Sequence, residues 1–122
     1  MTLQGVALFH LAYDASGTAS WARVVGFTGT LNSGEIVRVH AGRRRDLSVI
    51  RPEDMQGAHH HLFTGDDAYT WNNARGDSAL LYDEPQRQNI DRAWYAASPP
   101  EGVVVVRVGD QLVPNAARAA NW

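Results

Sequence analysis

The chain has 122 residues, a formal net charge of −2 and no cysteine. This length suits one domain that buries roughly two thirds of its unfolded surface. The lack of cysteine excludes disulfides and thiolate metal sites. The small negative charge gives no overall attraction to nucleic acid, although all eleven basic residues are arginine.

The segment Met1–Gly5 has no basic region and no long apolar stretch. We therefore expect no signal peptide and a cytoplasmic location. The longest apolar run, Val103–Val106, is far shorter than the ~20 residues that a membrane helix needs. The sequence predicts no membrane span.

Short strand-forming stretches follow one another in the first half of the chain. Val6–Tyr13 is apolar and aromatic, with His10 inside it, and its length favours a strand. Trp21–Val25 resumes the extended pattern, and Gly26–Leu31 is a short β-prone piece between glycines. Glu35–His40 alternates most clearly and predicts a strand with two different faces.

A long polar connection covers residues 41–58. It carries the consecutive arginines Arg43, Arg44 and Arg45, and later Pro52 followed by two acids. Proline at a first helical position followed by acids predicts one short helical turn. A connection of this length usually has a role or local structure of its own.

The stretch from Trp71 to Asp83 predicts a hairpin. Asn72–Gly76 is rich in residues that adopt positive φ at low cost, so it is typical of a connection of about five residues between two strands. The residues after Gly76 alternate as a strand does. We expect Trp71 to end the strand before the turn.

The second half predicts three more strands, Gln88–Tyr95, Val103–Val108 and Gln111–Val113, the last two joined by a Gly-Asp turn. About seven to nine short strands then follow one another without a crossover helix. This order predicts an all-β chain, an antiparallel sandwich or barrel. We expect residues 1–113 to form the domain and the alanine-rich residues 114–122 to form a loose tail.

Several spaced motifs together carry a family resemblance. They are Gly34, Val37-Arg38-Val39-His40, Gly42, Trp71-Asn72-Asn73, Gly76-Asp77, Ala79-Leu80-Leu81-Tyr82-Asp83 and Asp91-Arg92-Ala93-Trp94-Tyr95. Over about residues 20–95 the chain resembles the prokaryotic lamin tail domain. The resemblance implies an immunoglobulin-like antiparallel β-sandwich that serves attachment, contacts proteins, DNA or membrane-linked structures, and has no catalytic residues. The connection over residues 43–58 is longer than the family pattern.

Three adjacent histidines raise the question of a metal site. In a strand His59 and His61 would share one face, where His40 or Asp66 could complete a zinc site. No further ligand spacing accompanies them, so we expect no metal and no cofactor. His60 should lie on the opposite face, which leaves at least one of the three histidines in solvent.

The arginines Arg43, Arg44 and Arg45 are suited to contacts with phosphate or carboxylate. Acidic residues nearby offset their charge, and no aromatic residue between them could stack on a base. Nucleic-acid binding through this loop is therefore the alternative hypothesis rather than the first one.

The residues Trp71, Asn72, Asn73 and Asp77 offer a candidate polar ligand pocket. The alternative is that the polar three are turn residues whose side chains satisfy backbone groups. The tryptophans of the predicted strands, Trp21, Trp71 and Trp94, are expected in core or half-core positions.

A hydrolase would need a nucleophile beside an oriented base. Ser78 follows Asp77, but it lies in no G-x-S-x-G elbow, and the histidine spacing implies no triad. We therefore expect that the chain is not an enzyme. The sequence instead favours an interaction module that binds another protein, with self-association left open.

Overall fold

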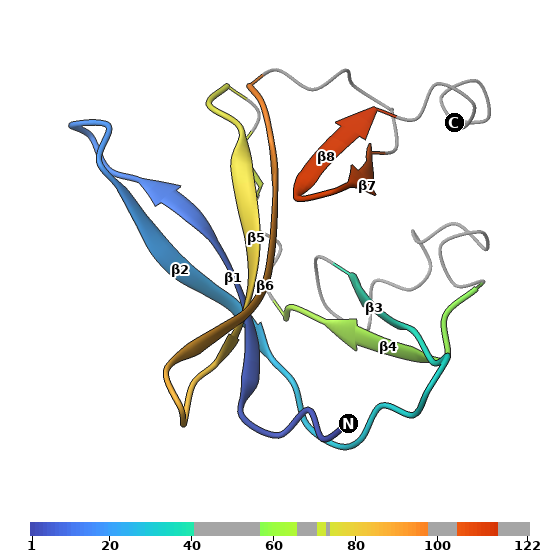
Figure 1. The fold of residues 1–122 in the computed structure, drawn as a ribbon. Helices are drawn as coiled ribbons and strands as arrows, with labels where there is room; N and C mark the ends of the chain where they lie inside the picture. Colours follow the sequence, from blue (N-terminus) through green and yellow to red (C-terminus); the bar gives the residue numbers. More distant parts are fainter. Residues whose placement is uncertain (41–56, 66–70, 73, 98–104, 115–122) are drawn as a thin grey trace.

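The structure is a computed structural model that describes residues 1–40, 57–65, 71–72, 74–97 and 105–114. These residues form eight strands and no helix, as predicted for an all-β chain (Figure 1). The strands are β1 (Val6–Tyr13), β2 (Ala19–Gly26), β3 (Val37–His40), β4 (His60–Phe63), β5 (Asp77–Asp83), β6 (Gln88–Tyr95), β7 (Val105–Val108) and β8 (Gln111–Pro114). Within these ranges no helix is long and apolar enough to cross a bilayer.

Six strands form one sheet in the order β2-β1-β5-β6-β8-β7. Its pairs are antiparallel except for β6 and β8, which run parallel where Trp94 faces Gln111. The strands β3 and β4 form a separate parallel pair. Parallel strands need a connection of a dozen or more residues, and the long segment between His40 and His60 supplies it. The prediction of antiparallel pairing is thus correct for most strand pairs and wrong for two, β3 with β4 and β6 with β8.

The buried apolar residues lie on three adjacent strands of the large sheet. They are Val6 and Ala7 of β1, Leu80 of β5 and Ala93 of β6. Two of the four are alanines, so apolar burial in the described part of the chain rests on small side chains. Polar contacts therefore matter more here than they do in a domain with a large aromatic core.

One face of the large sheet, called the inner face here, looks toward β3. Leu8, Ala79 and Leu81 on this face line an apolar cavity of about 400 Å³ together with Val37 and Val39. In Figure 1 the β3–β4 pair lies beside the large sheet rather than within it. The arrangement is consistent with a β-sandwich.

The opposite, outer face of the sheet carries aromatic rings and arginines. Phe9 and Tyr82 pack edge to face with ring centroids 5.8 Å apart. The guanidinium of Arg92 lies 5.2 Å from the centre of the Trp21 ring. Because side chains alternate along a strand, Trp94, two residues further along β6, belongs to the same face as Arg92.

The predicted hairpin around Trp71 is not found among the described residues. The strand β5 pairs with β1 on one side and with β6 on the other, and residues 66–70, where the first strand of the hairpin was expected, lie outside the described residues. Trp71 itself lies in a bend outside the strands. The motif does contain a turn, but this turn connects β5 to Trp71 and Asn72, which lie outside the strands.

Two further predictions also need correction. The β-prone piece Gly26–Leu31 forms no strand after β2; only an isolated bridge joins Thr2 to Thr30. The three tryptophans expected in core or half-core positions all lie at the surface, Trp21 at 40 %, Trp71 at 39 % and Trp94 at 38 % exposure. Alternation predicted strands correctly, but it did not say which face was covered.

The predicted strands Val6–Tyr13 and Gln88–Tyr95 have the observed bounds. The predicted helical turn and most of the connection over residues 41–58 lie outside the described residues, as do the tail residues 115–122. Pro114, assigned to the tail, is the last residue of β8 and pairs with Val105.

Candidate functional site

The site begins at a tight turn before β5. Gly76 adopts a φ of +72°, and a Cβ at this position would lie 2.4 Å from the carbonyl oxygen of Tyr95. Only glycine fits a backbone that combines positive φ with such a close approach. The turn places Asp77 as the first residue of β5, directly beside the end of β6.

The carboxylate of Asp77 is fully buried and is surrounded by hydrogen-bond donors. Its Oδ1 accepts from the backbone N–H groups of Leu11 and Ser78, each at 2.7 Å. Its Oδ2 accepts from Nδ1 of His10 at 3.1 Å and from the backbone N–H and Nδ2 of Asn72 at 3.0 and 2.9 Å. Five donors therefore satisfy one carboxylate, which joins β1, β5 and the preceding loop.

The side chain of Asn72 extends this network. Its Nδ2 also donates to the carbonyl oxygen of Leu11, and the backbone carbonyl oxygen of Asn72 accepts from the Tyr95 hydroxyl at 2.8 Å. Burial, followed by the charges of Asp77 and Tyr13, raises the pKa of Tyr95 to about 12. The phenol therefore stays neutral and acts as a donor at physiological pH.

Trp71 covers the histidine of this network. Its ring packs edge to face against His10 with centroids 5.8 Å apart. The side chain of His10 is only 14 % exposed, so Trp71 shields the bond from His10 to Asp77 from solvent on one side. The structure brings Trp71, Asn72 and Asp77 together in one polar joint around His10.

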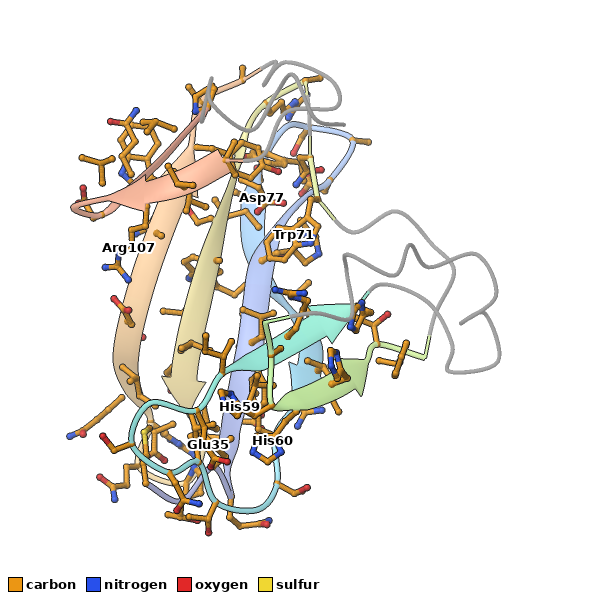
Figure 2. The ribbon with its side chains drawn as sticks, turned by 90° about the vertical axis from the view of Figure 1, so that its right-hand side faces the viewer. Glu35, His59, His60, Trp71, Asp77 and Arg107 are labelled. Carbon is orange, nitrogen blue, oxygen red and sulfur yellow. The ribbon has the colours of Figure 1, made fainter. Side chains whose placement is uncertain are left out.

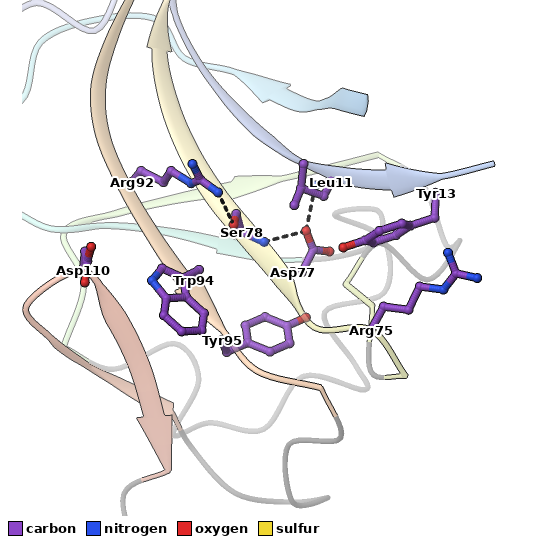
Figure 3. Close-up of a pocket in the computed structure, with 9 residues that line it drawn as sticks. All are labelled: Leu11, Tyr13, Arg75, Asp77, Ser78, Arg92, Trp94, Tyr95 and Asp110. Carbon is purple, nitrogen blue, oxygen red and sulfur yellow. Dashed lines mark hydrogen bonds between the residues drawn. The ribbon is translucent and has the colours of Figure 1, made fainter. Parts of the chain in front are cut away.

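A pocket of about 360 Å³ adjoins this joint at the end of the large sheet (Figure 3). Arg75 lies at one end of it beside Tyr13, and Arg92 lies at the other beside Ser78. The nine residues that line the pocket are Leu11, Tyr13, Arg75, Asp77, Ser78, Arg92, Trp94, Tyr95 and Asp110. The wall thus combines two guanidiniums with three aromatic rings.

The arrangement does not form a catalytic triad. The Ser78 hydroxyl accepts from Nη2 of Arg92 at 3.2 Å, and no hydrogen bond joins it to a histidine among the described residues. The Nδ1–H of His10 already donates a hydrogen bond to Asp77. Every buried side-chain nitrogen or oxygen in the described part has a hydrogen-bond partner. The buried carboxylate therefore acts as a structural acceptor, and the pocket can bind through its arginines.

Other predicted site residues fall elsewhere. Asn73 and the arginines Arg43, Arg44 and Arg45 lie outside the described residues, so the structure does not test the loop hypothesis. The side chains of Asn72 and Asp77 do satisfy backbone groups, as the turn interpretation predicted.

Sequence reasoning missed the residues that give the pocket its character, namely Arg75, Arg92, Trp94 and Tyr13. Arg92 and Trp94 stand two apart in a predicted strand, a spacing that puts both side chains on one face. That signal alone could have marked an arginine–tryptophan pair. Arg75 gave no comparable signal because its partner ring, Tyr13, is distant in sequence.

The histidines form a second polar cluster, at the opposite end of the sheet from Asp77 and Trp71 (Figure 2). Nε2 of His60 lies 3.3 Å from Oε2 of Glu35, and Nδ1 of His59 accepts from the backbone N–H of Ile36. His61 instead pairs with His40, with 2.9 Å between their ring nitrogens.

The strand β4 begins at His60, so His59 lies just before it, and the rings of His59 and His61 have different partners. The prediction of at least one solvated histidine is confirmed, since the side chain of His60 is 48 % exposed. Among the described residues no group of three or more side chains could hold a metal ion. Asp66 lies outside these residues.

We compared the chain with models of protein families, with curated proteins and with solved structures, and none of the three comparisons gave a match. The functional inference therefore rests on the surface and the pocket themselves.

Proposed function

We propose that the chain is a non-catalytic interaction module that binds another protein through the outer face of its large sheet. The observation that carries this proposal is the pair of exposed tryptophans on that face, Trp21 and Trp94, with Arg92 over the Trp21 ring. Tryptophan, tyrosine and arginine are the residues most enriched at the energetic centres of protein interfaces.

The polar joint at Asp77 supports the non-catalytic part of the proposal. A catalytic carboxylate needs free lone pairs and a nucleophile or proton donor that can reach the substrate. The two oxygens of Asp77 accept five hydrogen bonds from the protein itself. Such a group stabilises the fold and has no capacity left for chemistry.

The lamin-tail resemblance belongs to this proposal as well. Attachment is the role that the resemblance implies, and an exposed aromatic face suits attachment. A fold alone says little about what is bound, so the partner has to come from the surface itself.

Site-specific photo-cross-linking tests the proposal. A benzophenone amino acid replaces Trp94 on the outer face in one variant and Ile36, which is 50 % exposed and precedes β3, in the control. We expect a discrete protein adduct from the Trp94 position in native cells and none from the Ile36 position. Equal labelling at both positions would contradict an interface on the outer face.

Nucleic-acid binding is the second candidate. One observation favours it: Arg75 lies 5.0 Å from the centre of the Tyr13 ring and Arg92 lies over Trp21, and arginine with exposed aromatic rings is typical of surfaces on which bases stack. Against it stands the net charge of −2.

A salt titration decides between the two candidates. We expect no binding of random DNA or RNA tighter than about 100 μM at physiological salt. Binding through Arg43, Arg44 and Arg45 with one or two neighbours would instead be micromolar and would weaken with a log-log salt slope of about −3 to −5. That slope, abolished by replacing these three arginines with alanine, would make nucleic acid the primary ligand.

A further inference from the structure

The pocket beside Asp77 holds two arginines that no carboxylate neutralises among the described residues. Two other arginines of the same sheet do have such partners: Arg23 lies 3.0 Å from Glu84, and Arg107 forms a two-pronged pair with Asp91. Arg75 and Arg92 are instead held by aromatic rings, and Arg92 also by the Ser78 hydroxyl.

Stacking on a ring leaves the edge of a guanidinium open for hydrogen bonds. The five N–H donors of arginine lie in the plane of the group and match the two oxygens of a carboxylate. Arg75 over Tyr13 and Arg92 over Trp21 are therefore oriented without being saturated. An incoming carboxylate could bind either of them without breaking an ion pair within the described structure.

The pocket's other acidic or ionisable groups do not occupy these arginines. Asp77 is buried and already accepts five hydrogen bonds. Burial is the main reason why the pKa of Tyr95 is raised to about 12, so its phenol stays neutral. The phenol donates to the backbone carbonyl oxygen of Asn72. Neither group supplies a negative charge that could reach the guanidiniums in place of a ligand.

Asp110 and Trp94 indicate what other chemical groups a ligand of this pocket should have. Asp110 lines the pocket from the turn between β7 and β8, next to Trp94, whose backbone N–H donates to its carbonyl oxygen at 3.0 Å. The carboxylate of Asp110 can accept hydrogen bonds from backbone N–H donors of a ligand. The exposed ring of Trp94 offers an apolar surface. Acid groups, N–H donors and apolar carbon occur together in a peptide.

We propose that this pocket binds an acidic peptide segment of the partner protein, with carboxylates on Arg75 and Arg92. The inference rests on the proposed protein-binding function and names the chemistry of the partner. The volume of about 360 Å³ suits a few side chains rather than an extended polymer. Hydrogen bonds between guanidinium and carboxylate would give the specificity, and the Trp94 ring would hold the adjoining apolar part.

Fluorescence anisotropy with labelled hexaglutamate, hexaserine and oligo(dT) tests the proposal on the full chain. We expect hexaglutamate to bind and hexaserine not to bind. Arg75→Gln and Arg92→Gln should each weaken hexaglutamate binding by about tenfold. The matched control is Arg23→Gln, which removes the same charge from the same sheet at an arginine that is ion-paired with Glu84, and it should leave binding unchanged.

Three results would overturn the proposal: hexaglutamate binding no tighter than hexaserine, equal weakening by Arg23→Gln, or tighter binding of oligo(dT) through the same two arginines. Arg75→Gln decides the outcome if circular dichroism shows that Arg92→Gln does not fold, because Arg75 stacks on Tyr13 and makes no hydrogen bond or ion pair within the described residues. A protein adduct at position 94 without hexaglutamate binding would overturn the acidic-peptide proposal alone. Loss of the adduct would count against the protein-binding function itself.

Discussion

The two ends of the structure contain polar clusters of similar composition and opposite character. At one end Asp77 and His10 form a buried pair, whose side chains are 0 % and 14 % exposed. At the other end Glu35 and His60 form a pair whose side chains are 24 % and 48 % exposed. The difference teaches that an Asp–His or Glu–His pair acquires its role from burial and from the number of its donors.

The energetic consequence follows from solvation. A buried carboxylate that loses its partners remains desolvated, and each unsatisfied group then costs about 1–3 kcal/mol. An exposed pair exchanges its contact for water and loses little. The end with Asp77 should therefore control stability, while the end with Glu35 should tune it only weakly.

Removing the Asp77 carboxylate should have the largest effect. Asp77→Ala leaves Leu11, Asn72 and His10 with unmet donors, and we expect a loss of more than about 3 kcal/mol in urea unfolding. Asp83→Ala is the control at the other end of β5, where the carboxylate accepts one exposed bond from Gln86. A loss below about 1 kcal/mol for Asp77→Ala would remove the contrast between the two clusters.

The turn that places Asp77 should be almost as sensitive. Gly76 has a φ of +72°, and the Cβ of an alanine at this position would lie 2.4 Å from the carbonyl oxygen of Tyr95. Gly29 has a φ of +84°, but a Cβ there would have no atom within 4 Å. Positive φ alone costs about 1–2 kcal/mol for alanine. We expect Gly76→Ala to lose about 2 kcal/mol more than Gly29→Ala. Similar losses for both variants would show that the close approach relaxes freely.

Trp71 should contribute less than a core tryptophan. Core Trp→Ala changes cost about 3–5 kcal/mol, but Trp71 is 39 % exposed and packs on His10. We expect Trp71→Ala to cost about 1–2 kcal/mol, measured by thermal and urea unfolding. A cost of 4 kcal/mol or more, by the same scale, would mean that this ring is buried in solution.

The exposed pair of Glu35 and His60 should make a pH-dependent contribution to stability. The backbone N–H of Asn32, and then His60, lower the pKa of Glu35 below the ordinary value for a glutamate side chain. A depressed folded pKa gives stability that is present above the unfolded pKa and is lost as pH falls through the folded one. The difference in melting temperature between wild type and Glu35→Gln should thus be present above about pH 4.5 and shrink in acid. A difference that grows in acid would contradict the sign of the shift.

Zinc should have the smallest effect of all. The contacts of His59 with Ile36, of His60 with Glu35 and of His61 with His40 divide the histidines among separate partners. We expect no rise in melting temperature with zinc chloride. A rise that survives dialysis and disappears in a His59→Ala, His61→Ala double variant would contradict this expectation.

Local patterns predicted the strands well because each depends on neighbours in sequence. The strand Val6–Tyr13 could be found from its own apolar and aromatic residues, and Gln88–Tyr95 likewise. The parallel pairing of β3 with β4 could not be found in this way, since it depends on where a long connection returns.

The candidate site shows the same limit. Asn72 and Asp77 stood out because turns favour their side chains. Their partners His10 and Leu11 lie more than 60 residues away, and no local rule links the two segments. The exposure of Trp21 and Trp94 was also beyond prediction, because a period of two identifies faces and does not tell which face is covered.

The order of the large sheet has a consequence for how copies of the chain meet. The strand β2 ends the sheet, and among the described residues no strand pairs with its outer side. Its eight residues hold one charged side chain, Arg23, and no proline. Such an edge is a template on which a further strand can add. At high concentration two molecules could therefore join edge to edge into one continuous sheet, and a lysine in place of Ala22 would be a direct way to keep them apart.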